Sequence, residues 1–220
     1  MMGSGRRALG LLLAFSLAVA LGLGSSAATP VYRIPDNCKR LECPSYTVVH
    51  SQADFEIRRY QSVLWMSTPP LNSTSYTDAT GRGFSMLFSY IQGKNSKGAV
   101  IEMTAPVMVD VEPSTGPFCN SSFAVHLYMP KQYQQGKPPL SSEVIPTRLP
   151  VHRYAAVRRF GGFMNDSNIA PQVSLLRTSL KGSPWQASLA KTRGGGYTLA
   201  GYNSPFEYKN RVNEVLLWFD

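Results

Sequence analysis

The chain has 220 residues, of which 43% are hydrophobic, and its 22 basic and 13 acidic side chains give a formal net charge of +9. This length suits one domain, or two closely fused halves, with a substantial core. The basic residues are scattered and form no run of five or more, a pattern typical of a solvated basic surface. We therefore expect no nucleic-acid partner.

Residues 1–28 have the features of a secretory signal peptide. Arg6 and Arg7 precede an apolar run from Ala8 to Leu23, and small residues follow as far as Ala28. The apolar run is shorter than the ~20 residues that a helix needs to span a bilayer. We therefore expect cleavage after Ala27 or Ala28, secretion of the protein, and no stable membrane insertion.

Secretion would place the three cysteines, Cys38, Cys43 and Cys119, in an oxidising compartment. An odd number allows one disulfide with one free thiol, or an intermolecular bridge. We expect Cys119 to pair with Cys43 or Cys38, which would tie the N-terminal extension, residues 29–43, to the core. A zinc site is not expected, because no second cysteine pair or histidine pair lies at ligand spacing. Sequons for N-glycosylation begin at Asn72, Asn120 and Asn165, and we expect at least one to be used.

The remaining domain, residues 44–220, is predicted to consist of short strands interrupted by two helices. Alternating apolar residues and β-branched or aromatic residues predict strands over 46–50, 55–60, 63–68, 100–111, 123–129, 151–160, 197–202 and 212–219. Helical spacing predicts helices over 77–91, where Gly81 and Gly83 weaken the helix locally, and over 172–180. Pro106 cannot donate to a β-ladder, so it should split or kink the strand that contains it.

The two halves of this domain show a weak internal repeat. The segment "RRYQSVLW" (58–65) matches "HRYAAVRR" (152–159), and "MTAPVMV" (103–109) matches "YNSPFEY" (202–208), with a proline at the same place. We therefore predict an α+β fold in which duplicated βαββ units form a strongly curved, barrel-like antiparallel sheet with two main helices.

The residues give no sign of a catalytic centre. His50, His126 and His152 do not stand beside a serine or cysteine in a nucleophile motif. Glu102 and Asp110 share a strand face, but eight residues along a strand separate them by ~25 Å, too far to cooperate. The residues alone therefore indicate a secreted protein that is not an enzyme, with methionines and aromatic residues that suit a flat apolar ligand. A hydrolase that uses Glu102 or a tyrosine is a further hypothesis.

Six phrases, in order, carry a family resemblance: "FEIRRY", "YIQGKN", "IEMTAPV", "GPFCNSSF", "AAVRRFGGF" and "GYNSPFEYKNRVNEV". Together they span roughly residues 44–219 and resemble the SOUL haem-binding protein family. The resemblance implies a duplicated βαββ fold and non-covalent binding of haem or another tetrapyrrole, as in a secreted carrier or scavenger. The alternative is an extracellular interaction or stress-related protein that kept the fold without strong haem binding.

The resemblance also implies the binding residues. The family's apolar patch on the first helix maps to Phe84, Leu87, Phe88 and Ile91. Basic residues that face the ligand's propionates are matched only in part: Arg82 lies near them, Gly81 and Ser89 occupy two of their positions, and Glu207 occupies a third.

The iron ligand is a further point of departure. Some members carry a histidine, proposed as an axial ligand, where this chain has Arg59. Arginine stays protonated and cannot ligate iron usefully, so no metal ligand is assigned, and Arg58 or Arg59 is expected to pair with a ligand carboxylate instead. His50, His126, Tyr60 and Tyr90 are the alternatives for an axial ligand.

Overall fold

The structure, a computed structural model, describes residues 32–114, 120–191 and 195–220. In these residues one antiparallel sheet of ten strands has the order β1-β2-β8-β10-β9-β5-β6-β3-β7, with β4 paired to β6 outside this order. The strands are β1 (Tyr46–Gln52), β2 (Phe55–Tyr60), β3 (Val63–Ser67), β4 (Leu71–Ser73), β5 (Val107–Glu112), β6 (Ser121–Tyr128), β7 (Ile145–Leu149), β8 (Tyr154–Phe160), β9 (Tyr197–Gly201) and β10 (Asn213–Phe219). The helices are α1 (Tyr76–Ile91), α2 (Ile169–Ser179) and α3 (Gln186–Lys191), with 3-10 turns η1 (Asp36–Lys39) and η2 (Lys131–Tyr133). None of the described helices is long and apolar enough to cross a membrane.

The α+β class and the antiparallel sheet confirm the prediction, whereas the duplication and the barrel-like closure stay predictions. The two predicted helices and all eight predicted strand regions are present, with shifted ends. Three elements were not predicted: β4, which has only three residues, α3, and β7. The strand β7 contains Pro146 and pairs only with β3 at the edge of the sheet, which is where a strand tolerates proline.

Pro106 shortens the predicted strand 100–111 from its start. The strand β5 begins at Val107, and the residues before Pro106 bond elsewhere: the Ala105 N–H donates to the Glu42 carbonyl at 3.0 Å, and the Thr104 hydroxyl donates to the Tyr128 carbonyl at 2.6 Å. Pro205, its counterpart in the repeat, lies in the loop between β9 and β10. The second proline therefore does not interrupt a strand.

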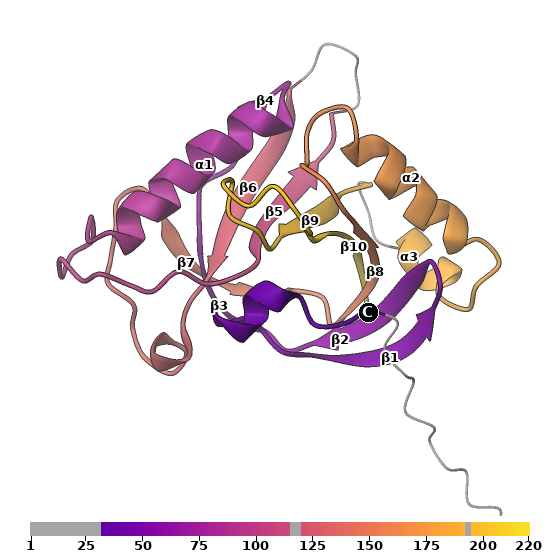
Figure 1. The fold of residues 1–220 in the computed structure, drawn as a ribbon, viewed down its shortest axis with the longest axis horizontal. Helices are drawn as coiled ribbons and strands as arrows, with labels where there is room; N and C mark the ends of the chain where they lie inside the picture. Colours follow the sequence, from indigo (N-terminus) through magenta and orange to yellow (C-terminus); the bar gives the residue numbers. More distant parts are fainter. Residues whose placement is uncertain (1–31, 115–119, 192–194) are drawn as a thin grey trace, which may run out of the picture.

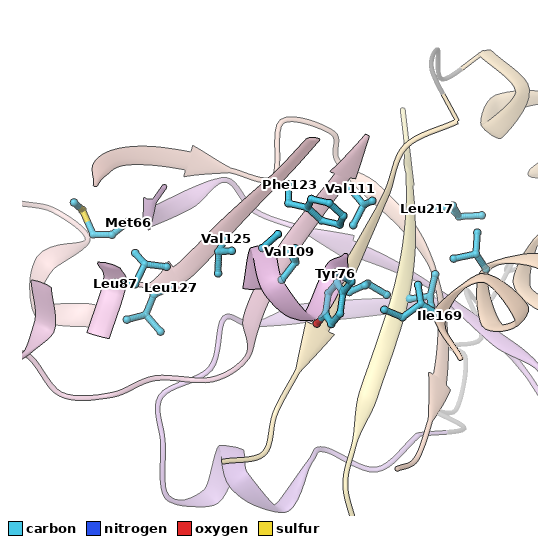
Figure 2. Packing of buried hydrophobic residues seen from close by; sticks show 14 of the residues in the cluster. Met66, Tyr76, Leu87, Val109, Val111, Phe123, Val125, Leu127, Ile169 and Leu217 are labelled. Carbon is cyan, nitrogen blue, oxygen red and sulfur yellow. The ribbon is translucent and has the colours of Figure 1, made fainter. Parts of the chain in front are cut away.

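One face of the sheet is covered by helices. Figure 1 shows α1 over one end of the sheet and α2 with α3 over the other end. Side chains of α1, β5, β6, α2 and β10 form a single buried cluster on this face, and Figure 2 shows part of it, with Leu87 of α1 close to Leu127 of β6. We call this the helix-covered face.

The opposite face, which we call the helix-free face, buries a second cluster that includes Trp65, Met108 and Leu216. Instead of a helix, the N-terminal arm, residues 32–45, packs against it through Cys38, Leu41 and Cys43. The arm therefore belongs to the folded domain.

Charged residues are buried on the helix-free face. Alternation along β2 places Phe55 and Ile57 in the helix-covered cluster and sends Arg58 to the opposite side. The guanidinium of Arg58 pairs with Glu56 at 2.8 Å and with Glu214 at 2.9 Å, and all three side chains are essentially inaccessible to solvent. Arg159 also pairs with Glu214, at 2.7 Å. Arg58 is therefore already neutralised within the protein.

The disulfide differs from the prediction. Cys38 is bonded to Cys43, so the expected bridge from either of them to Cys119 is wrong. Cys119 lies outside the described residues. The arm is held to the domain by packing and hydrogen bonds instead: the Asn37 amide donates to the Tyr202 carbonyl at 2.7 Å, and the Tyr32 N–H donates to the Glu56 carboxylate at 3.0 Å. No sequence pattern predicted these contacts, because the arm is largely polar.

Candidate functional site

The start of α1 is tied to the loop before α2. Ser75 is the N-cap of α1 and accepts a hydrogen bond from the Asp78 N–H at 3.2 Å. Asp166 accepts from the Tyr76 N–H at 2.5 Å and from the Ser75 hydroxyl at 2.8 Å. Partial burial acts to raise the pKa of Asp166, but these hydrogen bonds outweigh it and hold the pKa below its ordinary value. The loop that carries Phe163 and Met164 is thereby positioned beside α1.

The four apolar residues predicted on α1 point in two directions. Leu87 is 0% exposed and Ile91 is 1% exposed, and both belong to the helix-covered cluster. Phe84 and Phe88 lie on the outer side, where their rings stack with centroids 5.6 Å apart and an angle of 26° between the planes. Phe88 is 44% exposed. Only the phenylalanine pair is therefore available to a ligand at the surface.

A pocket of about 280 Å³ opens beside Phe84. Its walls come from α1, from β5, from the loop before α2 and from the loop between β9 and β10. The residues are Tyr76, Thr77, Thr80, Gly81, Phe84, Val107, Val109, Phe163, Met164, Gly201, Asn203, Pro205 and Arg211. The pocket, which we call the α1 pocket, is lined mainly by apolar groups with one cationic side chain.

Arg211 is that cation. Its guanidinium lies 4.0 Å from the centroid of the Phe163 ring, and one terminal nitrogen donates to the Ser204 and Glu207 carbonyls at 2.7 and 2.6 Å. Its Nε is buried, and no described group accepts from it. A buried donor without a partner costs ~1–3 kcal/mol.

The structure brings neither Arg82 nor Arg59 into this pocket. Arg82 is half-exposed on α1 and pairs with Asp78 at 3.0 Å. Arg59 is exposed on β2, in register with Thr47 of β1 and Tyr154 of β8, whereas α1 packs on β4 and β6. Arg211, and not Arg82 or Arg59, is thus the basic residue that lines the α1 pocket. Its position in "KNRVNEV", just before the last strand, was the sequence signal that could have identified it.

The candidate iron ligands lie elsewhere and have other partners. The His50 ring packs on Trp185, with centroids 4.5 Å apart. The Tyr90 hydroxyl donates to the Pro139 carbonyl at 2.9 Å, and Tyr60 accepts from Arg58 at 3.4 Å. None of these residues lines the α1 pocket. The described residues also hold no group of three or more His, Cys, Asp or Glu side chains that could bind a metal ion.

His126 belongs to a row of polar side chains that crosses the helix-free face. The Trp218 indole donates to the Thr198 hydroxyl at 2.7 Å, and that hydroxyl donates to Asp110 at 2.5 Å. The other oxygen of Asp110 lies 3.2 Å from Nε2 of His126, whose Nδ1 lies 2.7 Å from the Ser67 hydroxyl. The row contains a serine, a histidine and an aspartate, but Ser67 is only 3% exposed. A substrate therefore cannot reach this serine, and the row links strands instead.

The sequence of the chain matches a known family. A family model described as SOUL heme-binding protein matches residues 41–218. The chain belongs to this family. It is 40% identical over 167 residues to human "Heme-binding protein 2", which covers 74% of this chain and 77% of that protein. The mouse "Heme-binding protein 2" is 36% identical over 186 residues, or 80% of this chain and 85% of that protein.

Among solved structures, the chain is similar to one titled "Crystal structure of a hydrolase from Listeria innocua". The TM-score is 0.47 and the identity 10%, over 83% of this chain and 96% of the other. This likeness is too distant to indicate an activity. The SOUL family is named for haem binding and not for a reaction.

Proposed function

We propose that the protein holds haem or a related tetrapyrrole, without a covalent bond, against the outer side of α1. The supporting observation is the combination of a stacked phenylalanine pair on the outer side of α1 with a pocket that is lined by the half-buried cation Arg211. Aromatic rings of this kind suit a flat apolar ligand, because stacking removes a large apolar area from water. Among the four residues predicted on α1, Phe84 and Phe88 make this contact, and Leu87 and Ile91 support them from the core.

The size of the pocket indicates how such a ligand would lie. At about 280 Å³, the α1 pocket is slightly smaller than the ~300–1,000 Å³ typical of ligand sites. One edge of a macrocycle would therefore enter beside Phe84, and the rest would lie over Phe88. A propionate at the inserted edge would meet Arg211, whose Nε lacks an acceptor.

Binding of this kind does not depend on an iron ligand. The α1 pocket contains no histidine or cysteine among the described residues that line it. Tyr76 lines it, but burial raises the pKa of Tyr76 to about 12. A tyrosinate is therefore disfavoured. Iron-free protoporphyrin should bind within about tenfold of haemin, a difference of ~1.4 kcal/mol.

Titration of haemin, followed by absorbance, tests the proposal. We expect saturable binding at one equivalent, and Phe88→Asp should weaken it at least tenfold by placing a charge under the macrocycle. Leu175→Asp is the matched control, because Leu175 is 46% exposed on α2, close to the 44% of Phe88, and it should leave the affinity unchanged. Weak adsorption of several equivalents, unchanged in Phe88→Asp, would instead favour the interaction protein without a strong ligand.

We also propose that the protein is secreted. The supporting observations are the charged and apolar start of the sequence and the Cys38–Cys43 disulfide, since disulfides persist in oxidising compartments. Expression in cultured animal cells should release protein into the medium with an N-terminus at or near Ala28. Retention of the whole protein in cell lysates with an intact Met1 would contradict this.

A further inference from the structure

Another pocket lies beside the N-terminal arm and shares no lining residue with the α1 pocket. It has a volume of about 820 Å³ and is formed by the N-terminal arm and β1, with Lys131 and Tyr202. Val48 of β1 is in register with Arg58 of β2, so both side chains point to the helix-free face. The α1 pocket, by contrast, contains Val107 and Val109, which face the helices. The two pockets are therefore on opposite faces of the sheet.

We call this second pocket the arm pocket. Its aromatic side chains are held in place by two arginine side chains. The Tyr46 ring lies 4.1 Å from the guanidinium carbon of Arg58, and the Tyr32 ring lies 4.9 Å from that of Arg159. Both guanidinium groups are fixed by ion pairs to Glu214. A ligand would meet rings that are already ordered, which reduces the entropy lost on binding.

The rim of the arm pocket carries one cation that is not neutralised by an ion pair among the described residues. Three basic residues line it, Lys39, Arg40 and Lys131, against one acidic residue, Glu42. Lys39 pairs with Asp36 and Arg40 pairs with Glu207, whereas the ammonium group of Lys131 has no ion-pair partner among the described residues. The backbone N–H of Lys131 donates to Glu42 at 2.8 Å, which fixes the base of its side chain at the pocket.

We propose that the arm pocket is a second binding site, for small amphipathic carboxylates. The apolar body of the ligand lies on Tyr32, Tyr46 and Val48, and its carboxylate pairs with Lys131. The volume of the arm pocket, about 820 Å³, falls within the ~300–1,000 Å³ typical of small-molecule sites. Part of the arm, residues 32–40, precedes the segment that matches the SOUL family model. The site is thus distinct from the one proposed for the tetrapyrrole and does not depend on it.

Calorimetric titration with decanoate and with decan-1-ol, its uncharged counterpart, tests the proposal. We expect one equivalent of decanoate to bind, about three- to fivefold more tightly than the alcohol, as an exposed ion pair allows. Lys131→Gln should remove this preference and leave the affinity for the alcohol unchanged. Equal binding of both ligands by the wild-type protein, or adsorption of several equivalents, would overturn the proposal.

A matched pair of variants locates the site. Val48→Trp fills the arm pocket and should lower the affinity for decanoate more than tenfold. Val49→Trp places the same side chain at the next residue of β1, which is 47% exposed and does not line the arm pocket, and should bind decanoate normally. Haemin titration checks the folding of Val48→Trp, which should retain haemin binding, while Phe88→Asp should retain decanoate binding. Decanoate binding that persists in Val48→Trp, or that disappears in Phe88→Asp, would show that the arm pocket is not the site.

Discussion

Arg58 donates two parallel hydrogen bonds to Glu214, both at 2.9 Å, although 156 positions separate the two residues in the sequence. The pair joins β2 to β10, and β8 lies between these strands in the sheet. Burial acts to raise the pKa of the Glu214 carboxyl, but Arg58 and Arg159 outweigh it and hold the pKa below its ordinary value. The ionised form of Glu214 is therefore the form that stabilises the fold.

Glu214→Gln should lower the free energy of unfolding by about 3–5 kcal/mol, because it removes one of the two carboxylates that pair with the buried guanidinium of Arg58. Chemical denaturation at pH 7 measures this. Glu143→Gln, which removes the exposed pair with Lys94, should change stability by ~1 kcal/mol or less. Because the pKa of Glu214 is depressed on folding, its contribution is fully present above the ordinary value of 4.5 and is lost as the pH falls. A wild-type stability that is constant from pH 7 to pH 3 would contradict this.

Gly83→Ala should destabilise the protein, although alanine favours helices. A Cβ at Gly83 would lie 2.9 Å from Cβ of Val125 and closer still to its Cγ2, so α1 would have to move away from β6 at a cost of ~1–3 kcal/mol. At Gly81, two residues earlier, a Cβ meets nothing within 4 Å, and Gly81→Ala should stabilise the protein by up to ~1 kcal/mol. Thermal unfolding distinguishes the two, and an equal shift in the same direction for both would show that packing against Val125 is unimportant.

Arg211→Gln should weaken haemin binding by about three- to tenfold if its guanidinium holds a propionate. The dimethyl ester of haemin, which has no free carboxylate, should bind the wild type and the variant equally. This comparison separates the loss of an ion pair from a disturbance of the loop, because a disturbed loop would weaken both ligands alike.

Arg59→His should leave both the affinity for haemin and its absorption spectrum unchanged. The family resemblance places a proposed iron ligand at this position, but Arg59 lies on β2 and the α1 pocket is formed without that strand. The appearance of a low-spin, six-coordinate spectrum in the variant would show that haem binds beside β2 and not on α1.

How far the sequence predicts this protein is clear from β2 and α1. The alternation in "FEIRRY" predicted the bounds of β2 without error. It did not predict that Glu56 and Arg58 are buried, because their compensating partner is on a strand far along the chain. On α1, helical spacing placed Phe84, Leu87, Phe88 and Ile91 together, yet the sheet covers two of them and leaves the other two outside. Local sequence patterns determine where helices and strands form, whereas the burial of a given side chain depends on how the strands are ordered in the sheet.

The strand order also has a consequence for synthesis. The strands β9 and β10 follow all the other strands of the sheet in the sequence, yet they occupy its middle, between β5 and β8. While the ribosome still holds residues 197–219, both of these neighbours present unpaired edges, which are the surfaces that promote aggregation. The sheet can therefore be completed only after residue 219 has left the ribosome. A nonsense mutation that removes only β9 and β10 would split the sheet into two pieces with open edges, a far more damaging change than the loss of the same number of residues at an edge strand.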